Sequence, residues 1–598
     1  MSSPAIIRLE DVSFSYGDRD ARALDGVSLE VFPGEFVGVT GPSGAGKSTL
    51  AAVLSGAVPH HYRGRLYGAA LVDGHDTCEV SLTDIARTVG SVTQDIDAQM
   101  VASVVEDELL FGLENFGVDH DQVEGRLSGA LETVGIAELR DREIATLSGG
   151  QKQKVAVAAI LALRPRVLVL DEPTAALDPA SSKLIFQTLS QLNRDEGITV
   201  VVIEQKVALL SEFCSRVLVM DGGRLALDGT PREVFAHGSE LRRMGVDSPR
   251  VARVSNSLAE HGVIEPGPPC LSVGEAEELI RGLLAGRGEV PLPAADLAPC
   301  GGGPGTTSSQ ASPHAPVPRQ AEPVPAPVVE LRDVGFAYPG SGDGVSHVSL
   351  TVRPGELVGV VGQNGAGKTT LTKLLNGLLR PASGEVRVAG IDTREVPVSR
   401  IAAHVATLFQ NPDRQLCKDT VLDEVAFGLE LQGVDGDEAR RRAGAAAERF
   451  GLPAGESPFS LSRGQRQMVA LASVVVMEPQ VVLLDEPTSG LDYRECMTVM
   501  ETVREMAERG CAVIMVCHDM EVVSDFAERV VVMAGGRVLA DGPAAEVFSR
   551  PDVMAAASVE APQVAQLSRA LARSTSAEFA GISQVSGIVD LVEEMVRP

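Results

Sequence analysis

The sequence predicts an α/β fold made of two tandem domains, each with a mostly parallel sheet surrounded by helices. The chain has 598 residues, which is too many for one hydrophobic core. The same motifs occur twice in the same order, with matching lysines at Lys47 and Lys368, and this indicates an internal duplication. Within each copy, apolar runs typical of buried strands alternate with helical stretches, an alternation that favours a parallel sheet covered by helices.

A glycine-rich loop opens each copy. Residues 41–48 and 362–369 both fit G-x-x-x-x-G-K-[ST], and each loop lies between an apolar run and a helix-like segment. Backbone N–H groups of such a loop wrap a triphosphate, the lysine reaches the β- and γ-phosphates, and the last hydroxyl binds Mg²⁺. Chance would produce one such match on the order of 0.01–0.1 times in a chain of this length. The predicted nucleotide-binding residues are Gly41, Ser43, Gly44, Gly46, Lys47, Ser48, Thr49, Gly362, Asn364, Gly365, Gly367, Lys368, Thr369 and Thr370.

Two acids follow a buried-strand pattern in each copy. Asp171 and Asp485 come directly after apolar runs, and Glu172 and Glu486 are the next residues. An acid at the carboxyl end of a parallel strand faces the bound phosphates, so the two aspartates suit Mg²⁺, directly or through water. The two glutamates are placed to polarise an attacking water molecule.

A serine with glycines stands at a predicted helix start upstream of each acidic pair. A helix start of this kind forms a second anion-binding end. The residues concerned are Ser148, Gly149, Gly150 and Gln151 in the first copy and Ser462, Arg463, Gly464 and Gln465 in the second.

Charge and composition narrow the function classes. The formal net charge of −29 is the opposite of the basic surface typical of nucleic-acid binders. The 8 cysteines show no C-x-x-C spacing, which favours reduced thiols in a cytosolic protein. No apolar run is long enough to cross a bilayer and no signal-peptide pattern opens the chain, so we expect membrane contact through partners.

With these motifs the sequence resembles the ATP-binding-cassette (ABC) ATPases over both halves, including the D-loops at residues 175–178 and 489–492. The resemblance implies P-loop NTPase domains with a RecA-like core, an antiparallel β subdomain and an α-helical subdomain. It also implies a head-to-tail sandwich of two ATP molecules, in which each site joins one P-loop to the signature loop of the other half. Further residues follow from the resemblance: adenine-stacking Tyr16 and Tyr338, and the Q-loop residues Gln94 and Gln410, which contact nucleotide and its metal. Alone, a tyrosine after a strand is more often a packing residue.

The segments after the Q-loop glutamines resemble a narrower group. The pattern Q-N-P-D-x-Q at residues 410–415 and D-E-V-A-F-G-L-E at residues 423–430 are similar to the ATPase subunits of energy-coupling factor (ECF) transporters. The first copy departs at Ile96, where the group usually has proline, but keeps Asp97 and Gln99. This resemblance implies import of a vitamin, a vitamin precursor or a transition-metal ion.

The ECF resemblance also implies partners and a location. We expect a transmembrane coupling (T) component and a substrate-capture (S) component, with this chain peripheral on the cytoplasmic face of a bacterial or archaeal membrane. Asp97 and Asp413 are expected to pair with basic residues of the membrane partner, unless they are ordinary solvated acids. Two alternatives remain: a tandem ATPase of another ABC importer, for peptides or metals, and a soluble ABC ATPase that acts on ribosomes or DNA.

Composition and the resemblance together predict the domain boundaries. Residues 291–327 hold 10 Pro and 4 Gly, which is typical of a flexible tether. The predicted parts are a first ABC domain at 1–245, a short helical extension at 246–290, the linker, a second ABC domain at 328–548 and a helical extension at 549–598. The last part is either a diverged copy of the first extension or an unrelated tail.

The two predicted ATP sites are unequal. Gln205 stands where the second copy has His518, the residue that contacts the γ-phosphate in ABC ATPases, and Arg463 replaces a usual signature glycine. Both changes fall in the composite site built on Lys47, together with Glu172. We therefore expect the site built on Lys368, with Glu486 and His518, to carry most of the turnover, unless the two changes are neutral drift.

Overall fold

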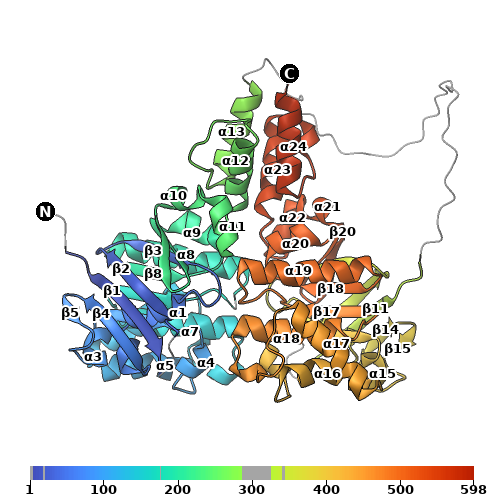
Figure 1. The fold of residues 1–598 in the computed structure, drawn as a ribbon, viewed down its shortest axis with the longest axis horizontal. Helices are drawn as coiled ribbons and strands as arrows, with labels where there is room; N and C mark the ends of the chain where they lie inside the picture. The colour runs from blue at the N-terminus through green and yellow to red at the C-terminus, as the bar shows by residue number, and fades with distance from the viewer. Residues whose placement is uncertain (1–3, 18–20, 176, 286–324, 340–343, 598) are drawn as a thin grey trace.

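The computed structural model describes residues 4–17, 21–175, 177–285, 325–339 and 344–597. Two copies of one architecture stand next to each other, the first drawn in blue to green and the second in yellow to red (Figure 1). Each copy has a four-stranded and a six-stranded sheet with helices packed around them, so the predicted α/β class is confirmed. Residues 291–324 of the predicted tether lie outside the described residues.

A six-stranded sheet forms the centre of each half. Its strands are parallel except one edge strand, Arg224–Gly229 or Arg537–Pro543, which is antiparallel to its neighbour, and the strand that leads into the P-loop lies among the inner strands. The inner strands of this sheet, such as residues 36–40, 199–203 and 357–361, are continuous runs of buried side chains because such a sheet is covered on both faces. In sheet order they are β10 (Arg224–Gly229), β9 (Arg216–Asp221), β3 (Phe36–Thr40), β8 (Thr199–Ile203), β7 (Val167–Asp171) and β6 (Val89–Val92), and then β16 (Val405–Leu408), β17 (Val481–Asp485), β18 (Ala512–Val516), β13 (Leu357–Val361), β19 (Arg529–Ala534) and β20 (Arg537–Pro543).

A second, antiparallel sheet packs over the P-loop helix of each half, α1 (Lys47–Leu54) or α14 (Lys368–Leu375). Its buried side chains form one core with that helix and the central sheet, so each P-loop is held between two sheets. The strands are β2 (Leu24–Val31), β1 (Ile7–Tyr16), β4 (Gly64–Val72) and β5 (His75–Asp76), and then β12 (Gly344–Val352), β11 (Val329–Ala337), β14 (Ser383–Val388) and β15 (Ile391–Asp392).

A helical subdomain follows each Q-loop and ends in the helix that begins with the signature segment. Its core comes from apolar residues at helical spacing, such as Leu109 with Leu113 and Leu127 with Leu131. The helices are α4 (Ile96–Gln99), α5 (Val105–Asn115), α6 (His120–Thr133), α7 (Gly149–Ala162), α16 (Val421–Leu431), α17 (Gly436–Arg449) and α18 (Arg463–Val475), with 3₁₀ turns at Ala137–Leu139, Ile144–Thr146, Pro412–Arg414 and Pro458–Ser460.

The remaining helices flank the central sheets. The D-loop acids Asp178 and Asp492 are the N-caps of the two longest helices, α8 and α19, because their carboxylates accept the first free N–H groups. Within the described residues, every helix is too short or too polar to cross a membrane. These flanking helices are α2 (Ala57–His60), α3 (Leu82–Ala86), α8 (Pro179–Glu196), α9 (Val207–Phe213), α10 (Pro231–Phe235), α11 (Gly238–Met244), α15 (Val398–Ala402), α19 (Tyr493–Glu508), α20 (Met520–Phe526), α21 (Ala544–Phe548) and α22 (Pro551–Ala556).

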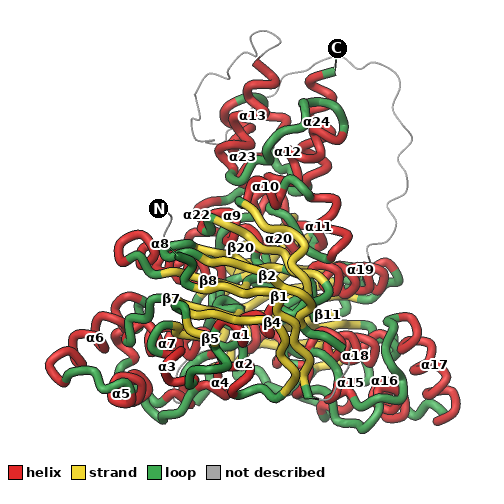
Figure 2. The backbone as a smooth tube through the Cα atoms, turned by 60° about the vertical axis from the view of Figure 1, so that its left-hand side comes forward, coloured by secondary structure: helices red, strands yellow, loops and turns green. Residues whose placement is uncertain are grey.

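Two helices at the end of each half rise together from the sheets (Figures 1 and 2). They are α12 (Arg250–Glu260) and α13 (Val273–Ala285) of the first half, and α23 (Gln563–Ser574) and α24 (Val585–Val596) of the second, which also has a 3₁₀ turn at Ala577–Phe579. Their apolar faces share one core, in which Leu258 and Ile280 meet Leu571 and Val592. The last two helices are therefore a structural counterpart of the first extension. The two helix pairs together join the two halves.

A buried arginine lies at the base of this helical pair. Arg250, the first residue of α12, has a side chain that is 6% exposed. Its guanidinium is 2.7 Å from Asp525 and 3.4 Å from Glu521, both on α20 of the second half. Burial raises the pKa of Glu521 to about 7, against the opposing effect of Arg250. This ion cluster links the first extension to the helix that begins two residues after His518.

We predict that Arg250→Met destabilises the chain by about 3–5 kcal/mol, because it leaves the partly buried carboxylates of Glu521 and Asp525 without a cation. The loss should be larger near pH 8 than near pH 5. A carboxyl group whose folded pKa is raised becomes charged, and costly, as the pH rises through that pKa. Calorimetric unfolding of the full chain at both pH values measures the effect.

The matched control is Arg253→Met, on the same helix. The Arg253 side chain is 24% exposed and reaches Asp247 at 3.6 Å, so its loss should cost much less. Equal destabilisation by the two substitutions would show that the Arg250 cluster does not hold the halves together.

Candidate nucleotide-binding sites

The first P-loop joins the end of β3 to the start of α1. Gly46 is the N-cap of α1 at φ 93°, and no side chain caps the helix, so its first N–H groups are free for an anion. Gly41 must be glycine because a Cβ there would lie 2.3 Å from the carbonyl oxygen of Met220. Lys47 donates to the carbonyls of Gly41 and Pro42, both at 2.7 Å, and burial lowers its pKa.

The second P-loop repeats this arrangement. Gly367 is the N-cap residue of α14 at φ 97°, and no side chain caps this helix. Lys368 donates to the carbonyls of Gly362 (2.6 Å) and Gln363 (3.0 Å), and burial lowers its pKa as well. The hydroxyl-bearing residues that follow, Thr369 and Thr370, open the helix in the places of Ser48 and Thr49. Both loops therefore present free amides and a buried lysine at the same place in the fold.

The metal-binding aspartates predicted from the sequence lie at the carboxyl ends of β7 and β17, close to the P-loop lysines. Burial raises the pKa of Asp171 to about 6, and a hydrogen bond from Ser48 acts against that rise. Burial raises the pKa of Asp485 too, against the charge of Lys368. The Asp171 carboxylate beside the Ser48 hydroxyl offers oxygen donors of the kind that Mg²⁺ prefers, so these residues fit that ion, and Asp485 occupies the matching place in the second half.

The next residues, Glu172 and Glu486, have the same unusual backbone. Both lie at φ 51°, a left-handed conformation that costs a non-glycine residue on the order of 1–3 kcal/mol. Their N–H groups donate to the neighbouring strand, at Ile203 (3.0 Å) and Val516 (2.9 Å). Strain of this kind is typical of functional residues, and here it fixes where each carboxylate leaves the sheet.

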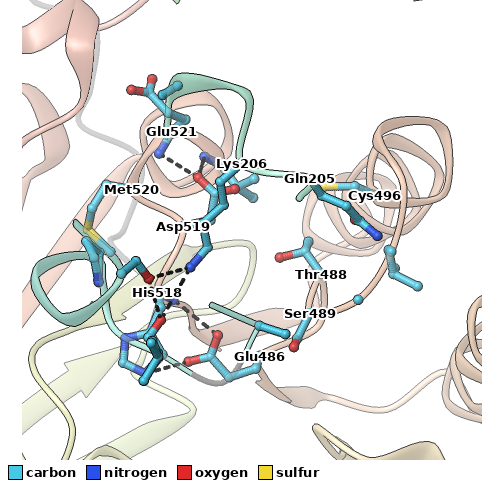
Figure 3. A pocket seen from close by; sticks show the side chains of 18 of the residues that line it. Gln205, Lys206, Glu486, Thr488, Ser489, Cys496, His518, Asp519, Met520 and Glu521 are labelled. Atoms are coloured by element: carbon cyan, nitrogen blue, oxygen red, sulfur yellow. Dashed lines mark hydrogen bonds and ion pairs between the residues drawn. The ribbon is translucent and has the colours of Figure 1, made fainter. Parts of the chain in front are cut away.

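Glu486 lies against His518 (Figure 3). Oε1 of Glu486 is 3.1 Å from Nε2 of His518, and Oε2 accepts the backbone N–H of His518 at 3.2 Å. Burial raises the pKa of Glu486 to about 8 and lowers the pKa of His518 to about 3. Burial thus favours the uncharged forms of both side chains.

Glu172 has amide partners instead. Its carboxylate accepts from Nε2 of Gln94 at 2.8 Å and from Nε2 of Gln205 at 2.7 Å. The Q-loop residue and the residue that replaces histidine are thus both brought to this glutamate. An amide can hydrogen-bond but cannot carry a proton at neutral pH, so the two glutamates stand in different chemical surroundings.

The signature segments start helices α7 and α18. Ser148 and Ser462 are the N-caps, and each forms a reciprocal capping box with Gln151 or Gln465. A cavity of about 770 Å³ brings Ser148, Gly149 and Gly150 of the first half together with the second P-loop, Gln410, Asp485, Glu486 and His518. The signature of one half and the P-loop of the other therefore line one space.

The predicted adenine-stacking residues lie near the P-loop helices. The Tyr16 hydroxyl is 3.1 Å from the hydroxyl of Thr49, and the Tyr16 ring meets Tyr62 edge to face with centroids 5.9 Å apart. Tyr338 is half-buried, with Nζ of Lys373 6.0 Å from its ring centroid. Both tyrosines are partly exposed, and adenine stacking stays a prediction.

Comparison with known proteins shows the family to which the chain belongs. A family model described as ABC transporter matches residues 24–175 and 345–489. A protein of Methanosarcina acetivorans assigned as an ABC transporter ATP-binding protein is 37% identical over 94% of this chain and 89% of its own length. One of Streptomyces avermitilis with the same assignment is 38% identical over 94% of this chain and 97% of its own length. The chain belongs to the ABC transporter ATP-binding proteins.

This ABC ATPase carries two cassettes in one chain and binds ATP, in line with its family. A solved structure of cbiO1 from Clostridium perfringens, described as part of the ABC transporter complex cbiONQ, shares 32% identity. It covers 43% of this chain and 100% of its own length, with a TM-score of 0.37.

Sequence reasoning missed one buried acid of this ABC ATPase. Glu204 is buried and accepts the N–H groups of Gln205 (2.9 Å) and Lys206 (3.1 Å) and the hydroxyl of Thr174. It holds the turn that carries Gln205, and Cys517 occupies the matching position before His518. The signal was visible in the sequence, because a glutamate at the end of a buried strand needs partners.

Proposed function

We propose that the chain is the ATP-hydrolysing motor of an ECF-type importer, working with a transmembrane coupling component and a substrate-capture component. In this proposal it lies on the cytoplasmic face of the membrane and drives uptake of a vitamin, a vitamin precursor or a transition-metal ion. The pattern that follows each Q-loop glutamine carries the proposal, because it is complete in the second half, is kept in part in the first half despite the departure at Ile96, and is similar to the ATPases of that group.

The local structure of this pattern supports the proposal. In the first half the buried carboxylate of Glu108 accepts the N–H groups of Val101 (2.9 Å) and Ala102 (2.7 Å). In the second half, Glu424 accepts those of Cys417 and Lys418, both at 2.7 Å. The glutamate of the pattern thus holds the same loop in both halves, as a shared docking element requires.

The surface beside this loop has the chemistry of a protein interface. Val101 is 64% exposed and Phe111 on α5 is 48% exposed. The Asp97 side chain is 78% exposed and pairs with Lys152 at 2.6 Å, and Asp413 pairs with Arg466 at 2.8 Å. Each aspartate thus forms an ion pair within its own half. A basic side chain of a docked helix would have to replace the basic partner in that pair or share the aspartate with it. Apolar side chains beside exchangeable ion pairs suit a helix with apolar and basic residues.

The proposed chemistry is ATP hydrolysis at the interface of the halves. Ser48, Gln94 and Asp171 would hold Mg²⁺ in the first site, and Thr369, Gln410 and Asp485 in the second. The ion would neutralise phosphate charge when bound. Lys368 and the free amides of α14 bind the phosphates, while Glu486 orients the water and takes its proton.

The test of the docking surface is the double substitution Asp97→Asn and Asp413→Asn. Both aspartates lose their charge, so we predict that the complex with the membrane proteins weakens about tenfold or more while ATP binding is unchanged. The measurement is copurification of the tagged chain from detergent-solubilised membranes, with the partners identified by mass spectrometry and nucleotide affinity measured on the same samples.

The matched control is Asp121→Asn with Asp437→Asn. These exposed acids occupy corresponding positions at the starts of α6 and α17. Recovery with ribosomes instead of membranes would point to the soluble class of ABC ATPase. If the T and S components copurify and the Asp97→Asn/Asp413→Asn variant binds them unchanged, the importer function is supported, but Asp97 and Asp413 do not contribute to docking.

A further inference from the structure

Two carboxylates of the second half contact the first P-loop. The backbone N–H of Ser43 donates to Oδ2 of Asp492 at 2.8 Å. The Ser43 hydroxyl donates to Oε2 of Glu495, also at 2.8 Å. Both acids belong to the start of α19. The two donor groups of a phosphate-loop residue are thus already bonded to carboxylates of the other half.

Glu495 also lies against the signature helix of its own half. A Cβ added at Gly464, in the first turn of α18, would lie 2.1 Å from Oε1 of Glu495. The carboxylate is therefore between the first P-loop and the signature segment that faces it. Its negative charge and that of Asp492 also act on Lys47.

Helix capping accounts for part of this geometry. Glu495 accepts the N–H of Asp492 at 3.1 Å, as a capping-box residue does. In the first half the matching position is Ser181, whose hydroxyl donates to Asp178 of its own half at 3.3 Å. Asp178 acts on Lys368 as Asp492 acts on Lys47, so the capping acid is common to both halves. Glu495 is an additional carboxylate, because the first half has Ser181 at this position. It therefore acts on the first site, built on Lys47.

We propose that Glu495 makes the first nucleotide site discriminate against the terminal phosphate of ATP, so that this site holds ADP more tightly than ATP. A terminal phosphate that reached the Ser43 donors would have to displace the carboxylate or lie beside it, and two negative charges in close contact oppose binding. A diphosphate uses the N–H groups of α1 and Lys47 and leaves Ser43 to Glu495. The sequence alone predicts ATP binding at both sites, and Glu495 modifies that expectation for the first. The proposal concerns nucleotide binding by the chain alone and does not depend on the importer function.

The experiment uses the full-length chain with Lys368→Ala to remove binding at the second site. Calorimetric titration with ADP and with a non-hydrolysable ATP analogue gives both affinities of the first site. Glu495→Gln keeps the shape and removes the charge, and Glu495→Ser installs the residue of the first half. Both are expected to raise the affinity for the triphosphate about tenfold or more and to leave the ADP affinity within about twofold.

A reciprocal variant tests the same idea at the other site. In a chain with Lys47→Ala, Ser181→Glu should lower triphosphate affinity at the second site without lowering ADP affinity. The ADP titration reports folding in every variant, and Glu495→Gln is available if the serine variant does not fold. If Glu495→Gln changes neither affinity, or changes both equally, Glu495 is a capping residue only and the proposal is overturned.

Discussion

Replacing Glu486 with glutamine is expected to reduce ATP turnover about 100-fold or more while leaving ATP binding intact. An amide of the same shape cannot take a proton from the attacking water, and positioned general bases contribute factors of about 10²–10⁴. The strained backbone at φ 51° and the contact with His518 hold the side chain in place, so the substitution should alter little else. Steady-state phosphate release and nucleotide affinity, measured on the same preparation, check both parts.

The paired control is Glu172→Gln, which makes the same change in the first site. We expect a much smaller loss there, because the amides of Gln94 and Gln205 surround Glu172 where the second site has an imidazole.

Single-turnover rates of the unmodified chain should rise between about pH 7 and pH 9, since Glu486, with a pKa of about 8, is active as a base in its deprotonated form. Near-normal turnover in Glu486→Gln would remove Glu486 from the role of base.

Much of the fold follows from local pattern. The apolar runs at residues 36–40 and 357–361 are the strands β3 and β13, because a strand buried on both faces has apolar side chains throughout. Each glycine-rich loop lies directly after its strand, as the strand–loop–helix context of the motif predicts. The α/β class and the tandem arrangement could therefore be predicted, and both are confirmed.

The contacts between the halves could not be predicted in this way. Arg250 lies in an amphipathic helix and has one local partner, Asp247, but its two other carboxylate partners, Glu521 and Asp525, are more than 250 positions further along the chain. Glu495 reads as an ordinary helix-capping residue until the fold brings it to Ser43. Such pairings depend on how two domains meet, and residue type and spacing within one segment carry no information about that.

His518→Ala is expected to reduce turnover about 100-fold, whereas Gln205→Ala should reduce it only about twofold or threefold. Phosphoryl transfer depends on groups that position the water and stabilise charge at the γ-phosphate. His518 contacts the proposed base Glu486 through both its ring and its backbone N–H, in the cavity that contains the first half's signature loop. Its low pKa keeps the imidazole neutral at physiological pH, so it acts as a hydrogen-bonding group beside Glu486.

Gln205 is in the less complete site. Its side chain holds Glu172 by one hydrogen bond at 2.7 Å, but Gln94 holds the same carboxylate at 2.8 Å, so loss of one amide leaves the other. Arg463 adds a guanidinium near Gly490 in this site, and Glu495 adds a carboxylate beside Ser43. Steady-state hydrolysis by the two alanine variants, with ADP affinity as the folding control, measures the difference. Equal losses would mean that both sites turn over at similar rates and that the replacement of histidine by Gln205 has no catalytic consequence.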